Sequence, residues 1–398
     1  MDFNDSYDVV VIGGGPAGAC FAKQAASKGL DVIIFDKRKE IGSPVKCGEG
    51  LGAHWNYWKL PINEKSIACN IEGAAAIAPN GKELVLQNDY TKGFVLERKI
   101  FDKFLAIEAG RAGAHVRAFS RVTDLIKENG KIAGVKVRYL GEEFDVKAKL
   151  VVSAEGMENL IARKAGIAKP ANAYDVDTCF EYELVNVDCS RRFIELFFGE
   201  KIAPRGYVWV FPKADDVANV GVGVGGHLGL DPRKLMDEFI KANPERYGKA
   251  ECVEVKGGVI SVGAPLKSLV TDNFMVIGTA AHQVDPIHGG GMGLAMEAGI
   301  IAADVAVAAF EKNDLSAKSL MPYQEKWLGA EEDKLEKRLK LRKVLEVLSD
   351  DDFNHIFNQL SNDDLDMVLK GNFAIPAAKV LAKRPSLLKV LGPISGIR

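Results

Sequence analysis

The stretch 7–38 constrains the fold more than any other part of this 398-residue chain. An apolar, β-branched run at 9–12 leads into the pattern G-x-G-x-x-G, formed by Gly13, Gly15 and Gly18, and an alanine-rich segment follows it. A strand buried on both faces, a tight turn and a helix are expected in that order. This arrangement is typical of the first half of a dinucleotide-binding βαβ unit.

The parts of this unit have separate expected roles. Gly13 turns the chain, Gly15 lets the backbone approach a pyrophosphate, and Gly18 allows the helix to pack closely. The unpaired N–H groups of the helix N-terminus then face the phosphates. A second apolar run, 32–35, ends in Asp36, which is placed to accept hydrogen bonds from an unphosphorylated ribose such as that of FAD or NAD.

The same glycine pattern recurs at Gly221, Gly223 and Gly226, where it has a different context. Residues 228–232 follow it, and no alanine-rich helix begins there. We interpret this second match as a glycine-rich strand end. The sequence therefore predicts one dinucleotide site.

Composition limits the classes of function that remain. The net charge of −2 and the pI near 6.4 give no reason to expect a nucleic-acid partner. The chain enters its first strand directly, so we expect no signal peptide, and apolar stretches such as 299–310 are expected to be too short to span a bilayer. Six cysteines without a C-x-x-C motif favour reduced thiols in a cytoplasm over a zinc site or a disulfide framework.

The order of the remaining segments predicts an α/β chain with two interleaved domains. A β-meander is expected over 114–148, followed by a buried strand at 150–153, whereas aromatic-rich strands are expected between 171 and 265. We assign 1–70, 97–170 and 269–321 to a discontinuous Rossmann-like domain, 71–96 and 171–268 to an antiparallel β domain for the substrate, and 322–398 to a C-terminal helical region. In the first domain the segment 40–52 is expected to be a loop with Cys47 at its centre, and the meander strands 143–148 and 150–153 are expected to be separate.

A second glycine cluster precedes a long helix expected at about 291–310. Because Gly289, Gly290, Gly291 and Gly293 carry no side chains, this helix N-terminus is left open to a ligand. In a flavin site its positive dipole would face the pyrimidine ring and stabilise negative charge there by a few tenths to about 2 kcal/mol.

Several of these motifs together resemble the glutathione-reductase-type FAD fold that is shared with aromatic hydroxylases. They are the first glycine motif with Asp36, Arg98 ahead of Phe101-Asp102, Ala154-Glu155-Gly156, and the segment 278–293. More narrowly, Pro-Val-Lys-Cys-Gly-Glu-Gly at 44–50, and Tyr-Val-Trp-Val-Phe-Pro at 207–212 followed by Gly221 and Gly223, resemble the archaeal geranylgeranyl reductases. Those enzymes saturate the isoprenoid chains of membrane ether lipids, and the resemblance covers about residues 7–310.

This resemblance implies an FAD-dependent reductase that delivers hydride from the flavin to prenyl C=C bonds of an ether-lipid precursor. It implies cofactor contacts from Gly13, Gly15, Ala17, Gly18, Asp36, Cys47, Gly48, Gly50, Arg98, Val122, Thr279, Asp285, Gly290, Gly291 and Met292. It implies a substrate channel lined by Tyr207, Trp209, Phe211, Gly221, Gly223 and His288, although aromatic residues alternating on one strand face also suit a packed core.

Two positions depart from the pattern of the fold. The usual Gly-Asp-Ala-Ala is Gly-Thr-Ala-Ala at 278–281, so Thr279, with Asp285, is expected to replace the missing carboxylate. The usual Ala-Asp-Gly is Ala-Glu-Gly, with Glu155 one methylene longer. His282, Asp285 and His288 have three-residue spacing, but we expect them to line the flavin loop and not to bind a metal.

Reduction of an isolated alkene also needs a proton, because no carbonyl is present to absorb the negative charge. We expect Cys47, Tyr207 or a water that they hold to supply it, which makes these two residues the catalytic candidates. Two other functions stay open: a flavin hydroxylase of small aromatics, and an electron-transfer flavoprotein that reduces a membrane quinone.

The sequence gives less information about the electron donor and about contact with the membrane. With one dinucleotide motif, the electron donor stays open among ferredoxin, a deazaflavin and NAD(P)H. The segment 371–398 has five basic residues, no acidic ones, and Leu387, Leu388, Val390 and Leu391. We therefore expect a cytoplasmic protein that touches the inner face of the membrane peripherally, where its lipid substrate lies. The alternative is that this segment packs its leucines on the body of the protein and leaves its lysines in water.

Overall fold

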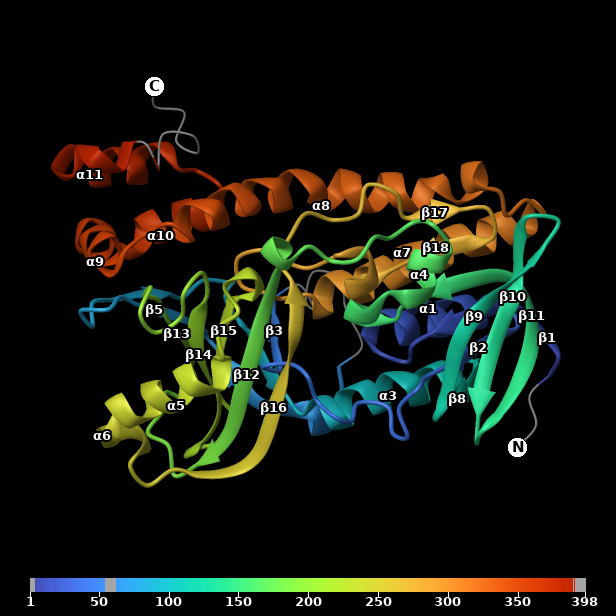
Figure 1. The fold of residues 1–398 in the computed structure, drawn as a ribbon, viewed down its shortest axis with the longest axis horizontal. Helices are drawn as coiled ribbons and strands as arrows, with labels where there is room; N and C mark the ends of the chain where they lie inside the picture. Colours follow the sequence, from blue (N-terminus) through green and yellow to red (C-terminus); the bar gives the residue numbers. More distant parts are fainter. Residues whose placement is uncertain (1–3, 54–61, 389, 391–398) are drawn as a thin grey trace.

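The computed structural model describes residues 4–53, 62–388 and 390. Two large sheets lie side by side, and the long helices of the second half of the chain extend along one side of both (Figure 1). The strands are β1 (Ser6–Ile12), β2 (Val32–Phe35), β3 (Gly50–Gly52), β4 (Ile67–Ile71), β5 (Gly73–Ile77), β6 (Glu83–Leu86), β7 (Gly93–Leu96), β8 (His115–Arg117), β9 (Ser120–Glu128), β10 (Lys131–Tyr139), β11 (Glu142–Ser153), β12 (Val176–Val185), β13 (Phe193–Phe197), β14 (Tyr207–Pro212), β15 (Val217–Gly225), β16 (Glu251–Ser261), β17 (Val270–Thr271) and β18 (Phe274–Val276). The α-helices are α1 (Pro16–Ser27), α3 (Arg98–Arg111), α4 (Leu160–Lys164), α5 (Pro232–Ala242), α6 (Pro244–Tyr247), α7 (Met292–Glu311), α8 (Ala317–Leu345), α9 (Asp350–Gln359), α10 (Asn362–Leu369) and α11 (Ala374–Lys383).

The first sheet has the order β17-β18-β11-β1-β2-β8, and β18, β11, β1, β2 and β8 run parallel. Val10 of β1 lies between Val151 and Ile33, and all three side chains are fully buried. Such two-sided burial explains the unbroken apolar runs of the sequence. The predicted Rossmann-like unit is confirmed.

The meander is confirmed with one correction. The strands expected at 143–148 and 150–153 are a single strand, β11. Its first half pairs antiparallel with β10 as far as Lys147, and its second half pairs parallel with β1. Because the strand changes partner without turning, no turn residue marks the junction.

The second sheet has the order β16-β12-β15-β14-β13-β5-β6. It is antiparallel except for β5 and β13, which pair in parallel from Gly73 and Phe193 onward. The sequence did not predict β16 or α5, and it placed 93–96 in this domain although β7 pairs with β3 and β4 in a separate small sheet. The expected loop at 40–52 accordingly ends in a strand, β3, because residues 50–52 pair with β7.

The two faces of the second sheet differ in chemistry. Valines such as Val208, Val220 and Val222 point to the face that Met236 and Phe239 of α5 cover. The register pairs Tyr207 with Gly223 and Trp209 with Gly221, which puts the aromatic residues on the other face. That face is turned toward the cavity described below.

The helix α7 matches the helix expected at 291–310 to within one residue at each end. It runs from Met292 to Glu311 with a mean hydropathy of 1.7, so it has the length and composition of a membrane span, contrary to the expectation from 299–310. Most of its residues are buried inside the protein, where it packs between α1 and α8. Its apolar composition is explained by its position in the core of the protein.

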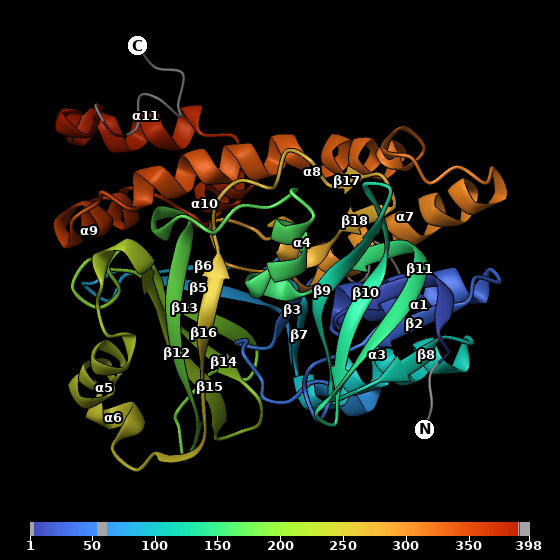
Figure 2. The ribbon, with the colours of Figure 1, turned by 45° about the vertical axis from the view of Figure 1, so that its right-hand side comes forward.

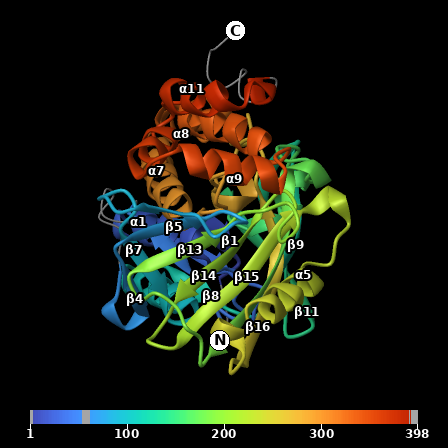
Figure 3. The same ribbon diagram turned by 90° about the vertical axis from the view of Figure 1, so that its left-hand side faces the viewer.

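The C-terminal helices cover the open side of the second sheet, as Figure 3 shows for α8, α9 and α11. The helix α8 starts at Ala317 and includes Pro322, where the helical region was expected to begin. Side chains of α8, α9 and α11 pack on the β5–β6 hairpin through a shared cluster. The cluster contains Ala78, Leu84, Val344, Leu348, Phe353, Phe357, Val380 and Leu387.

Candidate active site

A cavity of about 1890 Å³ runs between the two sheets and beneath the C-terminal helices. Single-ligand pockets usually measure about 300–1000 Å³, so this one has room for more than one ligand. One end is formed by the glycine motif of the first sheet and the other by apolar side chains of the β5–β6 hairpin and α8–α11. Figure 2 shows how these elements converge.

The glycine motif has the geometry that its sequence predicted. Gly13 has a φ of +105°, and a Cβ at Gly13 or Gly18 would overlap a backbone carbonyl. The Cβ position of Gly15 is open and faces the cavity. Gly18 does not line the cavity, so its role is to let α1 pack against the turn.

Asp36 lies at the end of β2 and lines the cavity, together with Ala17 and Val122. Its side chain is 3% exposed, and its carboxylate accepts hydrogen bonds from the backbone N–H of Gly14 and Arg38, both at 2.8 Å. The backbone thus fixes the carboxylate at the position where a ribose would bind.

Two helix N-termini open onto this cavity. The N-cap residues are Gly15 for α1 and Gly291 for α7, and neither has a side chain that caps the helix. Gly290, Met292 and Thr279 line the cavity beside the second N-terminus. Two uncapped N–H clusters, an open glycine and a fixed carboxylate suit the pyrophosphate, ribose and flavin ring of FAD.

Asp285 lines the cavity, but both of its carboxylate oxygens are already bound by groups of the protein. Its Oδ1 accepts hydrogen bonds from the N–H of Ile287 and His288 at 2.8 and 3.2 Å, and its Oδ2 pairs with His288 and Arg338. Burial would raise the pKa of Asp285, but His288 and Arg338 outweigh burial and hold the pKa far below the usual range. Asp285 therefore holds the loop and ties it to α8.

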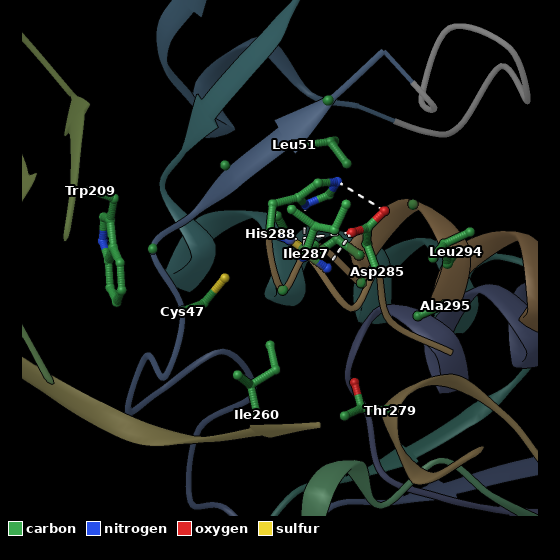
Figure 4. Close-up of a pocket in the computed structure, with 18 of the residues that line it drawn as sticks. Cys47, Leu51, Trp209, Ile260, Thr279, Asp285, Ile287, His288, Leu294 and Ala295 are labelled. Atoms are coloured by element: carbon green, nitrogen blue, oxygen red, sulfur yellow. Dashed lines mark hydrogen bonds and ion pairs between the residues drawn. The ribbon is translucent and has the colours of Figure 1, made fainter. Parts of the chain in front are cut away.

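Cys47 lies between Trp209 on one side and the loop of Asp285, Ile287 and His288 on the other (Figure 4). The Sγ accepts a hydrogen bond from the N–H of Glu49 at 3.2 Å. Burial raises the pKa of the Cys47 thiol, and Arg98 opposes this only in part. A thiol in this state keeps its proton at neutral pH.

The glycines beside Cys47 allow close packing against the aromatic face of the second sheet. A Cβ at Gly48 would stand 3.2 Å from the indole nitrogen of Trp209, and a Cβ at Gly50 would stand 3.0 Å from the ring of Phe211. Both glycines also line the cavity. The loop and the strand β14 therefore form one continuous wall.

Arg98 lies at the start of α3 and lines the cavity. Its guanidinium makes a bidentate pair with Asp102, with both N–O distances 2.7 Å. The pKa of Arg98 is raised because Asp102 and Cys47 outweigh burial. The cation is thus fixed beside the thiol.

Tyr207 and His288 meet across the cavity. The Tyr207 hydroxyl donates a hydrogen bond of 2.6 Å to the backbone carbonyl of His288. Burial raises the pKa of the Tyr207 hydroxyl. Its proton is thus held by the backbone carbonyl.

A group of buried ionisable residues lies next to Cys47, and the sequence analysis did not single it out. We call it the ionic cluster, which consists of Glu49, Glu181, Glu183, Lys213 and Lys256 with Asn219. Except for Glu183, each of its side chains is less than 9% exposed. The signal in the sequence is the alternation of Glu181 and Glu183 with Phe180, Tyr182 and Leu184 along β12.

The apolar end of the cavity extends beyond the predicted channel. Tyr207, Trp209, Phe211 and His288 line it, whereas Gly221 and Gly223 lie beneath the Trp209 ring. The C-terminal helices and Cys179 also line the cavity, although no motif of the sequence predicted them there. The further lining residues include Ala76, Leu84, Leu86, Phe198, Leu345, Leu348, Phe357, Leu360 and Val380.

Glu155, one of the two departures from the fold's pattern, has a local role. Its carboxylate accepts hydrogen bonds from the N–H of Ile161 at 2.9 Å and of Ala162 at 3.2 Å, and from the hydroxyl of Ser153 at 2.8 Å. The longer side chain therefore reaches the N-terminus of α4.

His282 and His288 belong to the loop that carries Asp285. Among the residues described, no group of three or more His, Cys, Asp and Glu side chains is arranged to hold a metal.

Two family models match the chain. The model of FAD-dependent oxidoreductases matches residues 8–173, and the model of the geranylgeranyl reductase catalytic domain matches residues 175–260. The second match covers the strands that carry Trp209 and the ionic cluster. The two models therefore divide the cavity between a cofactor part and a catalytic part.

The chain is similar over nearly its whole length to relatives that carry a functional name. A digeranylgeranylglycerophospholipid reductase of Methanothrix thermoacetophila is 38% identical over 92% of this chain and 94% of its own length. One of Methanocaldococcus jannaschii is 37% identical over 98% of both chains.

Solved structures agree with these relatives. A geranylgeranyl bacteriochlorophyll reductase-like protein of Thermoplasma acidophilum has a TM-score of 0.89 and 34% identity, over 98% of this chain and 99% of that chain. A flavin-dependent brominase shares the fold at a TM-score of 0.75 and 21% identity, over 96% of this chain. With these similarities and the cofactor site described above, the chain belongs to the geranylgeranyl reductase family of FAD-dependent oxidoreductases.

Proposed function

We propose that this protein saturates the geranylgeranyl chains of digeranylgeranylglycerophospholipids, with FAD as its cofactor. The names of its relatives support this substrate. The observation that carries the proposal is a single cavity that joins the nucleotide site to a long apolar end, with Cys47 and Trp209 between them. A small aromatic substrate would need no apolar extension of this kind.

The apolar end suits a long hydrocarbon chain. Each buried methylene contributes about 0.8 kcal/mol, so a prenyl chain beneath α8–α11 would be bound mainly by its length. The same walls keep water away from the reacting double bond. The proton for the reduction must then come from a side chain.

Bound FAD supplies the hydride in its reduced form. Cys47 is the proton donor that we propose for the neighbouring carbon, because its thiol lies at the junction of the two halves of the cavity and keeps its proton. For Tyr207 we propose a holding role, since its hydroxyl already donates to the His288 carbonyl.

The electrons come, in this proposal, from an external donor, which is ferredoxin, a deazaflavin or NAD(P)H. We also propose that the protein works in the cytoplasm and touches the inner face of the membrane, because a lipid with two long chains must be loaded from a bilayer. Lys379 and Arg384 pair with Asp364 and Asp352, so these two charges do not support membrane contact, and Lys389, Leu391 and Arg398 lie outside the described residues.

Mass spectrometry of lipids tests the function directly. Cells with a geranylgeranyl lipid supply that express the protein should accumulate lipids with two added hydrogen atoms for each reduced double bond. Each of the three donors can then be supplied to purified protein and lipid in turn. Oxygen consumption with NADPH and aromatic acids, without any change in the lipids, would instead identify a hydroxylase.

Vesicle co-sedimentation tests the membrane contact. Binding to anionic vesicles should weaken at high salt and should be reduced in a chain that ends at Gly371. Equal binding by both chains would remove the C-terminal segment from the proposal.

A further inference from the structure

Glu181 is a buried carboxyl group that the mechanism above does not use. It lies on β12, is 3% exposed and lines the cavity. Its Oε2 accepts a hydrogen bond of 2.6 Å from the indole N–H of Trp209. Its Oε1 lies 3.3 Å from Lys256 Nζ and has no hydrogen-bond partner in the part of the chain that the structure describes.

The ionic cluster has one carboxyl group more than its ammonium groups can balance. Lys213 and Lys256 both contact Glu49 and Glu183, at 2.8–3.1 Å, so these two positive and two negative charges cancel, and the partly exposed Glu97 adds a further carboxylate 2.9 Å from Lys213. Glu181 is the fifth group, and it shares its one countercharge, Lys256, with Glu49 and Glu183. Burial accordingly raises the pKa of Glu181 to about 8, although Lys256 opposes the shift.

The carboxyl group of Glu181 lies beside Gly48, the residue that follows Cys47. Oε1 faces the Lys256 ammonium, so the proton belongs on Oε2. That oxygen would be 3.3 Å from a Cβ built on Gly48, the residue after Cys47. A charged Glu181 adds to the effect of burial in raising the pKa of the Cys47 thiol, as expected for close neighbours.

We propose that Glu181 holds a proton beside the cavity and passes it to the Cys47 thiolate after each reduction. This inference rests on the proposed function. For each double bond, one carbon receives the hydride, and the S–H bond of Cys47 breaks as a C–H bond forms on the neighbouring carbon. The thiolate then takes the proton from Glu181 Oε2, and neither side chain changes its oxidation state.

The Glu181 carboxylate that remains takes up a new proton from the exposed side of the sheet. Lys256 Nζ lies between Glu181 and Glu254, whose side chain is 25% exposed, at 3.3 and 4.0 Å. Because the pKa of the thiol is raised above its ordinary value and that of Glu181 is about 8, the transfer from Glu181 to the thiolate runs downhill.

This role predicts a pH dependence. Below about pH 8 Glu181 holds its proton, and above that pH it is ionised and cannot reload Cys47, so turnover should fall as the pH rises through about 8. The titratable or charged groups that face Glu181 or its neighbour Cys47 are Cys179 and Glu183 on β12, Tyr207 on β14, Lys256 on β16, Lys213 after β14, Glu49 and Cys47 in the loop before β3, and Arg98 on α3.

The first test uses Glu181→Gln, which keeps the length of the side chain and an oxygen that accepts from Trp209. We expect turnover to fall about a hundredfold and to lose its decline near pH 8, with FAD binding unchanged. Glu181→Asp keeps an acid and should recover part of the rate and the decline. Glu195→Gln is the matched control, because Glu195 pairs with Arg246 and does not line the cavity.

Two measurements on purified protein without lipid separate this inference from the proposed function. The infrared difference spectrum between the parent and Glu181→Gln should contain the C=O band of a protonated carboxyl group that disappears above about pH 8. The rate of Cys47 alkylation, followed by peptide mass spectrometry against pH, should shift to lower pH in Glu181→Gln, because a charge that raises the thiol pKa is gone.

An unchanged alkylation curve together with no carboxyl band would overturn the proposal even if the lipids are reduced. If Glu181→Gln does not fold, Glu181→Ala is measured in the same way. A carboxyl band and an alkylation curve identical to those of the parent in that variant would also overturn the proposal.

Discussion

The indole of Trp209 lies across Gly221, its partner on the neighbouring strand β15. A Cβ at Gly221 would overlap this ring and would stand 2.9 Å from the Cβ of Glu181. Because the ring can lie flat only over a glycine, Gly221 is what lets the Trp209 N–H reach Glu181.

Gly221→Ala should therefore displace Trp209 at a cost of about 1–3 kcal/mol in unfolding free energy. Prenyl reduction should fall, FAD binding should remain, and the Trp fluorescence should change. Gly329→Ala is the control, since a Cβ there meets nothing within 4 Å and its helix should gain stability. Equal activity of the two variants would argue against this packing.

Asp36→Ala should weaken FAD binding by about ten- to a hundredfold, because a charge-assisted hydrogen bond contributes about 1.5–3 kcal/mol. The loss also frees the N–H groups of Gly14 and Arg38. Flavin fluorescence titration measures the effect. Asp304→Asn, at a half-buried position on α7 that does not line the cavity, should leave FAD affinity unchanged.

Cys47→Ser should slow saturation of the prenyl chains by about a hundredfold or more, because a general acid contributes that much and a serine hydroxyl is a far weaker acid. Bound FAD should be retained, as its absorbance will show. Cys252→Ser, at an exposed position outside the cavity, is the control. A variant at position 47 with the parental rate would mean that another group donates the proton.

Ala76→Trp should block the apolar end of the cavity, where Ala76 faces the C-terminal helices. Reduction of a long geranylgeranyl chain should stop early, whereas a short prenyl substrate that ends before this point should still turn over. Counting the added hydrogen atoms by mass spectrometry distinguishes the two cases. Ala242→Trp, exposed at the end of α5, should reduce both substrates normally.

Arg338→Met should destabilise the protein by about 1–3 kcal/mol, because Asp285 is 1% exposed and loses one cation. A carboxyl group with a lowered pKa adds stability above its unfolded pKa of about 3.9, and that stability is lost as the pH falls through the folded pKa. The variant raises the folded pKa, so acid unfolding should begin at a higher pH. Urea unfolding against pH checks this, with the exposed Lys340→Met as control.

Local patterns predicted the cofactor half of the molecule well. The run 9–12, Gly13 and Asp36 obey rules that depend on a few neighbouring residues, and the open N-terminus of α7 follows from its glycines. The catalytic half depends on strand register. Glu181, Lys256 and Trp209 come together only because three strands pair residue by residue, and no short window of sequence carries that information.

The apolar end of the cavity could not be predicted from the sequence, for a related reason. Residues such as Leu348 and Phe357 have ordinary helical spacing, which indicates a buried face but not what is buried against it. The same holds for β5, whose parallel pairing with β13 joins residues about 120 positions apart. A turn does not connect these two strands, so hairpin signals could not reveal the pair.

The interleaving of the two sheets also has a consequence for synthesis on the ribosome. Strand β18, which completes the first sheet beside β11, is made about 120 residues later, after nearly all of the second sheet. The edge of β11 is therefore unpaired while the intervening strands emerge, and contacts so distant in sequence form slowly. An early translational stop should leave a nascent chain that aggregates or recruits chaperones, whereas a stop after α8, whose Tyr323 and Trp327 belong to the core of the first sheet, should release one able to retain FAD.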